Sequence, residues 1–168
     1  MKLNLMYIFF LFLLTSTLSA KDTSGKSLNI NIKEEGIFIN EVKLSGTFKI
    51  DEYDPILGKY DLKESREDGL YYTWDKLGIK LREDLTSQTI NQLSIYLVIS
   101  RASDTKKPFL GKVNVLSKEV NAKVSPSKFS NDIICQQIFC TFKTENINVN
   151  TNLTEDKKKF KILLVKID

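Results

Sequence analysis

The chain has 168 residues, of which 42% are hydrophobic and 27% charged, and its formal net charge is +4. It contains no His, which excludes Ser-His and Cys-His nucleophile arrangements and removes the commonest general base and metal ligand. The Lys and Arg residues are dispersed, with one short cluster at residues 157–159 before an apolar terminal segment. This pattern favours a solvated loop over a nucleic-acid-binding stripe.

Residues 1–20 have the layout of a secretory signal peptide. A positively charged start precedes the apolar residues 5–14, and small residues lead to Ala20. The apolar run is too short for a membrane-spanning helix, which needs about 20 residues, so an uncleaved anchor is the less favoured alternative. We therefore expect cleavage after Ser19 or Ala20 and a single domain over residues 21–168. This domain is expected to be periplasmic or secreted, with no membrane insertion after cleavage.

Alternation of apolar and polar residues dominates the rest of the chain and predicts half-buried strands. The segments with this pattern are, in chain order, 28–32, 37–39, 42–44, 70–74, 79–81, 93–99, 113–115, 147–149 and 160–167. Asn40 and Glu41 separate two of these segments and predict a hairpin turn. The last segment is nearly continuous in apolar residues, as expected for a central strand.

Helical signals are scarce. Residues 51–57 predict a short helix that ends at Gly58. Residues 127–134 predict a second helix, because apolar side chains recur there at roughly helical spacing and Ser127 or Ser130 could cap the first turn.

A faint internal repeat links these elements. The segments that begin at Gly36 and Gly111 both continue through a hairpin and a short helix to a long apolar strand. Identity between them is poor, so either duplication or convergence of ordinary β-rich patterning accounts for the repeat. The pattern as a whole predicts an α+β fold, a mostly antiparallel β-sheet with one or two short helices packed on one face.

Cys135 and Cys140 are the only cysteines, and they lie in the part of the chain expected to be exported, where oxidation is usual. Their spacing suits a disulfide across a tight loop or adjacent strands, which we favour over a reduced buried pair. The second helix must then end before Cys135, because residues five apart in a helix are too distant to pair. A zinc site would need further Cys or His ligands, so we expect no metal and no other cofactor.

Residues 70–75 concentrate aromatic side chains, including the only Trp of the chain. Trp and Tyr dominate interface hot spots, so Tyr71, Tyr72, Trp74 and Asp75 are a candidate protein-binding surface. The simpler interpretation is that Tyr72 and Trp74 are the core face of a strand and that Tyr71 and Asp75 lie outside it.

Acidic residues cluster at several points of the chain, namely at residues 34–35, 51–54, 64–68 and 83–84. Solvated turns and helix starts explain these clusters, and no spacing selects the facing pair of carboxylates that a glycosidase needs. The sequence contains no phosphate-cradling Gly-rich loop, nucleophile elbow or dinucleotide fingerprint. We therefore predict no catalytic residues and a protein that is not an enzyme.

Three segments, at residues 56–59, 72–79 and 109–113, carry a resemblance to a known family. The middle one contains Trp74-Asp75-Lys76-Leu77-Gly78-Ile79, and the third reads Phe-Leu-Gly at the entry to a strand. The chain resembles an uncharacterised family of small bacterial proteins with a Trp-Asp-x-Leu-Gly-Ile core, over roughly residues 36–120. The resemblance implies a non-enzymatic α+β domain, and some members of the family are encoded near interbacterial toxins.

These observations lead to one expected function and two alternatives. We expect an exported protein that binds a protein partner and no nucleic acid, with an immunity or inhibitor role against an envelope-acting bacterial toxin as its specific form. The first alternative is a periplasmic accessory or scaffold module that binds outer-membrane proteins or a cell-wall ligand. The second and least favoured is a histidine-free hydrolase that uses paired carboxylates.

Overall fold

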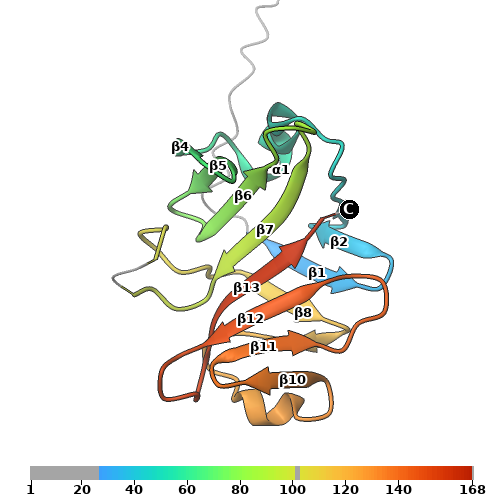
Figure 1. The fold of residues 1–168 in the computed structure, drawn as a ribbon, viewed down its shortest axis with the longest axis vertical. Coiled ribbons are helices and arrows are strands. Elements are labelled where there is room, and N and C mark those ends of the chain that lie inside the picture. The colour runs from blue at the N-terminus through green and yellow to red at the C-terminus, as the bar shows by residue number, and fades with distance from the viewer. Residues whose placement is uncertain (1–26, 101–102, 168) are drawn as a thin grey trace, which may run out of the picture.

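The computed structural model describes residues 27–100 and 103–167, and its strands form two sheets (Figure 1). The strands are antiparallel apart from one pair in the smaller sheet, and the helices are short. The predicted α+β class with a mostly antiparallel sheet is therefore confirmed. The predicted signal peptide, residues 1–20, lies outside the described residues. Within the described part of the chain, no helix has the length and apolar character needed to cross a membrane.

The smaller sheet has five strands in the order β3-β2-β1-β8-β9. Their bounds are β1 (Asn29–Lys33), β2 (Gly36–Ile39), β3 (Val42–Lys43), β8 (Lys112–Val115) and β9 (Lys118–Glu119). Strand β1 is antiparallel to β2 and parallel to β8, so it joins two hairpins that lie far apart in the sequence. The predicted turn at Asn40 and Glu41 is present, and both residues have the positive φ typical of a two-residue hairpin turn.

The larger sheet has eight strands in the order β10-β11-β12-β13-β7-β6-β5-β4. Their bounds are β4 (Leu62–Arg66), β5 (Gly69–Trp74), β6 (Ile79–Glu83), β7 (Ile90–Tyr96), β10 (Ile133–Gln136), β11 (Phe139–Phe142), β12 (Val149–Leu153) and β13 (Phe160–Lys166). Strand β13 pairs with both β12 and β7, as predicted for a central strand. Strands β7 and β13, which are the last strands of the first and second halves of the chain, run side by side through the middle of Figure 1.

Each sheet contributes one face to a single hydrophobic core. Ile30 and Ile32 of β1 are fully buried, as are Leu93 and Ile95 of β7, and all four belong to one cluster. Because side chains alternate along a strand, the other face of each sheet points away from this core. The face of the eight-stranded sheet that is directed away from the core is called the outer face below.

The first predicted helix is present and starts one residue earlier than expected. It begins as a 3-10 turn, η2 (Ile50–Tyr53), and continues as α1 (Asp54–Leu57). Gly58 ends it with a φ of 75°, a conformation that glycine adopts without a Cβ clash. At the start, the backbone N–H of Lys49 donates to the Glu52 carboxylate over 2.6 Å, which satisfies one of the free N–H groups.

The prediction of a helix over residues 127–134 is wrong. The structure has a single 3-10 turn there, η3 (Pro126–Phe129), capped by the side chain of Ser125, and the chain then enters β10. Pairing of β10 with β11 replaces a helix too short to be stable by itself. The apolar residues that suggested a helix lie on two different faces of this strand, since Ile133 is buried and Ile134 is exposed.

The order of elements is the same in the two halves of the chain. Each half has a hairpin in the smaller sheet (β2–β3 and β8–β9), a short helix, and then a four-stranded meander in the larger sheet (β4–β7 and β10–β13). Both hairpin turns have two residues with positive φ, Asn40 and Glu41 in one and Leu116 and Ser117 in the other. The segments matched in the sequence therefore occupy equivalent places in the topology.

Candidate functional site

A cluster of charged and aromatic side chains covers the outer face of the sheet over β4–β7. This Asp104 cluster consists of Asp104, from the loop after β7, with Arg66, Tyr71, Lys80 and Tyr96 on the strands. Lys80 Nζ lies 2.7 Å from Asp104 Oδ2, Tyr96 donates to the same oxygen over 2.9 Å, and Arg66 Nη2 lies 3.2 Å from Oδ1. Both oxygens of the carboxylate are thus engaged by strand side chains.

The Asp104 cluster is tightly packed, and its two cations share the Asp104 carboxylate, while the Glu64 carboxylate also lies 2.9 Å from Arg66 Nη2. Only 2% of the Lys80 side chain is exposed, and its Nζ lies 4.1 Å from the centre of the Tyr71 ring. The guanidinium of Arg66 lies 4.7 Å from the same centre. A buried lysine is tolerated when a carboxylate and an aromatic face replace its hydration, so the arrangement satisfies the charge of Lys80.

The surroundings of the Asp104 cluster shift the pKa values of Asp104 and Tyr96 in directions that maintain the hydrogen bond between them. Burial alone would raise the pKa of Asp104, but hydrogen bonds from Lys80, Tyr96 and Arg66 lower it below its usual range. Burial, with the charge and hydrogen-bond acceptance of Asp104, raises the pKa of Tyr96 well above its usual range. At neutral pH the carboxylate is therefore charged and the phenol neutral, as the hydrogen bond between them requires.

The four residues predicted as a binding surface are not brought together on one face. Tyr72 and Trp74 are 2% exposed and belong to the core. Tyr71 lies on the outer face within the Asp104 cluster, and the Asp75 carboxylate is 2.9 Å from Lys106 Nζ. Strand alternation separates neighbours onto opposite faces, so Tyr72 and Trp74 lie on the core side of β5 and Tyr71 on its outer face, as the simpler interpretation of the sequence predicted.

The outer face over β10–β13 is open. Ile134 is 62% exposed and Phe139 is 59% exposed, and both line a shallow hollow of about 580 Å³. The other outward-facing residues of the hollow are Gln136, Thr141, Asn150, Asn152 and Leu164. Its lining, which lies entirely within the described residues, carries no charged side chain. We call this surface, defined by Ile134, Phe139, Leu164 and the polar residues just named, the open face.

Hydrogen bonds and a disulfide hold the open face in shape. The Thr141 hydroxyl donates to Asn150 Oδ1 over 2.8 Å, which ties β11 to β12. On the other side of the hairpin, Cys135 and Cys140 occupy directly opposite positions and their sulfur atoms lie at disulfide distance. The predicted pairing of the two cysteines is therefore present, across adjacent strands.

The open face was missed by the sequence analysis because residues 127–134 were interpreted as a helix. A signal was present, since Ile134 and Gln136, and then Phe139 and Thr141, are spaced by two residues on either side of a short turn. This spacing is that of one face of a hairpin.

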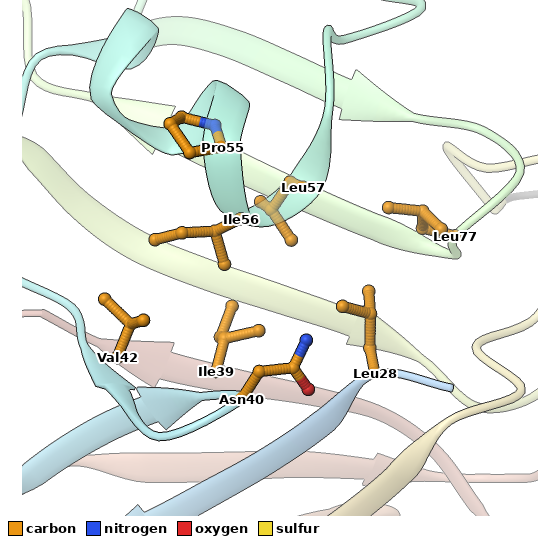
Figure 2. Close-up of a pocket in the computed structure, with 8 residues that line it drawn as sticks. All are labelled: Leu28, Ile39, Asn40, Val42, Pro55, Ile56, Leu57 and Leu77. Atoms are coloured by element: carbon orange, nitrogen blue, oxygen red, sulfur yellow. The ribbon is translucent and has the colours of Figure 1, made fainter. Parts of the chain in front are cut away.

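A second feature, an apolar pocket of about 220 Å³, lies beside the first helix. Figure 2 shows Pro55, Ile56 and Leu57 of α1 facing residues of the smaller sheet across this space. The lining on the side of the smaller sheet consists of Leu28, Ile39, Asn40 and Val42, and Leu77, from the turn between β5 and β6, completes it. A pocket of this size accommodates an apolar side chain, but three of its lining residues, Leu28, Ile39 and Leu57, belong to the core, and Ile56 and Leu77 pack against it.

The three segments that carried the family resemblance meet close to this pocket. Trp74 Nε1 donates to the carbonyl of Gly58 over 2.7 Å, which joins the first segment to the second. A Cβ on Gly78 would lie 2.3 Å from the backbone N of Phe109, so only glycine allows the second and third segments to approach so closely. Their shared role in the structure is packing.

Groups of metal-ligating residues are absent from the described residues, since no three His, Cys, Asp or Glu side chains converge there. Comparison with protein families matches residues 29–130 to a domain of unknown function, DUF7738. The matched range ends before β10, so the open face and the cysteine pair lie outside it. Neither the curated proteins nor the solved structures contain a match.

Proposed function

We propose that this chain, which belongs to the DUF7738 family, is an exported, non-enzymatic domain that binds a protein partner through the open face. The observation that carries the proposal is the pair of large apolar side chains, Ile134 and Phe139, exposed on adjacent strands in a hollow whose lining carries no charged side chain. Exposed apolar patches with a polar rim are typical of interaction sites. The partner surface expected to fit is apolar and uncharged.

The free energy available at the open face is sufficient for a specific contact. Complete burial of a Phe or Ile side chain contributes about 1.5–3 kcal/mol relative to full exposure, and more than half of each side chain is still exposed here. The amide side chains of Gln136 and Asn152, which line the hollow, can satisfy polar groups of a partner, as the rim of an interface does.

A binding role without catalysis is supported by the chemistry of the ionisable groups. The chain has no His, and Lys80, the only buried Lys, Arg, Asp or Glu among the described residues, is engaged by Asp104. A general base or nucleophile needs a group that is free to exchange a proton with a substrate. Asp104 instead accepts hydrogen bonds at both of its oxygens.

An extracytoplasmic location is supported by the signal-peptide layout of residues 1–20 and by the cysteine pair. Within that compartment, we propose an immunity or inhibitor role against an envelope-acting toxin as the specific form of the function. This step rests on the resemblance to proteins encoded near interbacterial toxins.

The test uses the mature chain, residues 21–168, with the proteins encoded by the genes adjacent to its own gene. We expect a complex at micromolar concentrations or tighter and at least about tenfold weaker binding by Phe139→Lys. A matched control is Leu110→Lys, because Leu110 is 84% exposed and does not line the open face. Absence of a complex, or equal effects of the two substitutions, would contradict the proposal.

A cell-wall ligand is the second candidate, favoured by one observation. Three amide side chains, Gln136, Asn150 and Asn152, line the same hollow as the ring of Phe139, and amides beside an aromatic ring suit hydroxyl-rich ligands. Co-sedimentation of the mature chain with purified peptidoglycan separates the two candidates. Binding that is lost in Phe139→Lys in this assay, with no protein complex, would favour the cell-wall ligand.

A further inference from the structure

The two sheets end in four edge strands, and these differ in how they are protected. Strands β3 and β9 have two residues each and both carry charge, and β4 has the sequence Leu-Lys-Glu-Ser-Arg. Very short strands and charged side chains are the usual means of preventing an edge from pairing with another chain. Strand β10 has four residues, Ile-Ile-Cys-Gln, with no charge and no proline. It is the one edge strand of the described residues that lacks such protection.

The backbone of β10 is available for pairing at Cys135. The Cα atoms of Cys135 and Cys140 are 4.0 Å apart, which is the close spacing of a non-hydrogen-bonded pair in an antiparallel ladder. In such a pair the N–H and C=O groups point away from the partner strand, so those of Cys135 point out from β11. Among the described strands β10 pairs only with β11, and Cys135 is exposed.

The edge of β10 is continuous with the open face. Ile134 projects from β10 onto the outer face, and Phe139 lies on the neighbouring strand opposite Gln136. A strand added along β10 would therefore direct every second side chain toward Ile134 and the hollow. Its backbone would supply affinity through the ladder, and these side chains would supply specificity.

The cysteine pair makes this edge suitable for receiving a strand. It links β10 to β11 directly opposite the free backbone groups of Cys135. An incoming strand therefore meets a β10 that is already held in position, which reduces the ordering entropy lost on binding.

We propose that β10 accepts an extended segment of the protein partner as an additional strand of the larger sheet, with apolar side chains alternating onto the open face. This inference rests on the proposed function and specifies its mode of recognition. A partner segment fits better than a second copy of this chain. A four-residue edge spans only about 13 Å and cannot by itself supply the roughly 1,200 Å² of a stable interface. A foreign segment can also fill the adjoining hollow.

The test uses a displayed library of random peptides of about ten residues, selected on the disulfide-bonded mature chain. We expect selected peptides to carry apolar residues at every second position. N-methylation at the positions that pair with β10 should weaken binding at least about tenfold, whereas methylation one residue along should change it by less than about twofold. Exchange of the Cys135 amide hydrogen should slow at least about tenfold in the complex.

Two variants locate the peptide on the sheet. Ile134→Lys introduces the charge that the other edges carry and should weaken binding at least about tenfold. Leu62→Lys is the matched control, because Leu62 is an exposed apolar residue on the opposite edge strand, β4. This control should change binding by less than about twofold.

The outcomes separate the mode of recognition from the proposed function. Peptides that need Phe139 but tolerate every N-methylation would overturn strand addition and leave the open face as the binding surface. A dimer in sedimentation that Ile134→Lys disrupts and that excludes the peptide would overturn it in favour of self-pairing. Selection of no peptide that contacts β10 also rejects strand addition, and the partner-binding assay with Phe139→Lys then decides the proposed function by itself.

Discussion

Strands β4–β7 and β10–β13 form meanders of the same topology in one sheet, but their outward-facing side chains differ in chemistry. On the first meander, Lys80 and Arg66 meet Asp104 from a loop, and the charges are satisfied within the molecule. On the second, Ile134 and Phe139 remain exposed. The same backbone arrangement thus gives a sealed surface in one half and an open surface in the other. The difference depends on a few side chains and on the loop that supplies Asp104.

Replacing Lys80, the buried cation of the β4–β7 meander, is expected to lower the free energy of unfolding more than the other substitutions described below. Lys80→Met leaves Asp104 without its closest partner and should lower the free energy of unfolding by about 2–3 kcal/mol. The effect stays below that of a fully buried pair, because 35% of the Asp104 side chain is exposed. Chemical denaturation followed by the fluorescence of Trp74 measures it.

A second substitution provides the control for Lys80→Met. Adding Asp104→Asn removes the unpaired charge and should restore at least about half of the lost stability. If Lys80→Met alone changes stability by less than about 0.5 kcal/mol, the Asp104 cluster does not hold this half of the sheet together.

Removing the disulfide of the β10–β13 meander should have the next largest effect on the free energy of unfolding. Replacing Cys135 and Cys140 by Ser opens a short loop and is expected to cost about 2 kcal/mol. Hydrogen exchange should accelerate in β10 and β11 before β4 and β5, because the link lies on the edge hairpin of the second meander. Equal acceleration in both meanders would show that the halves do not open independently.

Acid should remove the contribution of the Asp104 cluster to stability. The pKa of Asp104 is lower in the folded chain than its ordinary value, so the unfolded chain binds more protons over this range and stability falls as the pH drops from about 5 through the folded pKa. We expect a contribution of about 1 kcal/mol, since Asp104 is partly exposed. Urea denaturation at several pH values should give a shallower acid slope for the Lys80→Met, Asp104→Asn double variant. Identical slopes would rule out this contribution.

Polar substitution on the open face should have the smallest effect on stability. Phe139→Ser should change the free energy of unfolding by less than about 0.5 kcal/mol, because the ring is largely exposed in the folded chain. Binding of a hydrophobic dye should decrease in Phe139→Ser and remain unchanged in Leu62→Ser on β4. A large loss of stability in Phe139→Ser would mean that Phe139 serves packing rather than recognition.

Much of the fold could be predicted from local pattern. Alternation located β1, β5, β6, β8 and β13, and the two-residue turn at Asn40 and Glu41 was evident from the apolar segments on either side. Strands β4, β10 and β11 were the main exceptions. Strand β4 was missed because Leu62 is its only apolar residue, and β10 was hidden by apolar spacing that also suits a helix.

Only part of the candidate site followed from the sequence. The pairing of Cys135 with Cys140 could be expected from their spacing and compartment, whereas the open face could not. The exposure of Ile134 and Phe139 depends on how the second meander packs against the core. The alternation of side chains along a strand indicates which of them share a face of the sheet, but not which face packs against the core.

The sequence by itself determined the α+β class, most strands and the absence of histidine chemistry, because these depend on composition and on contacts between near neighbours. The tertiary structure decided that Tyr72 and Trp74 face the core, that Asp104 reaches Lys80, and that the two meanders join through β7 and β13. These features depend on pairing between distant segments. Such pairing is selected by burial of the whole core rather than by local propensity.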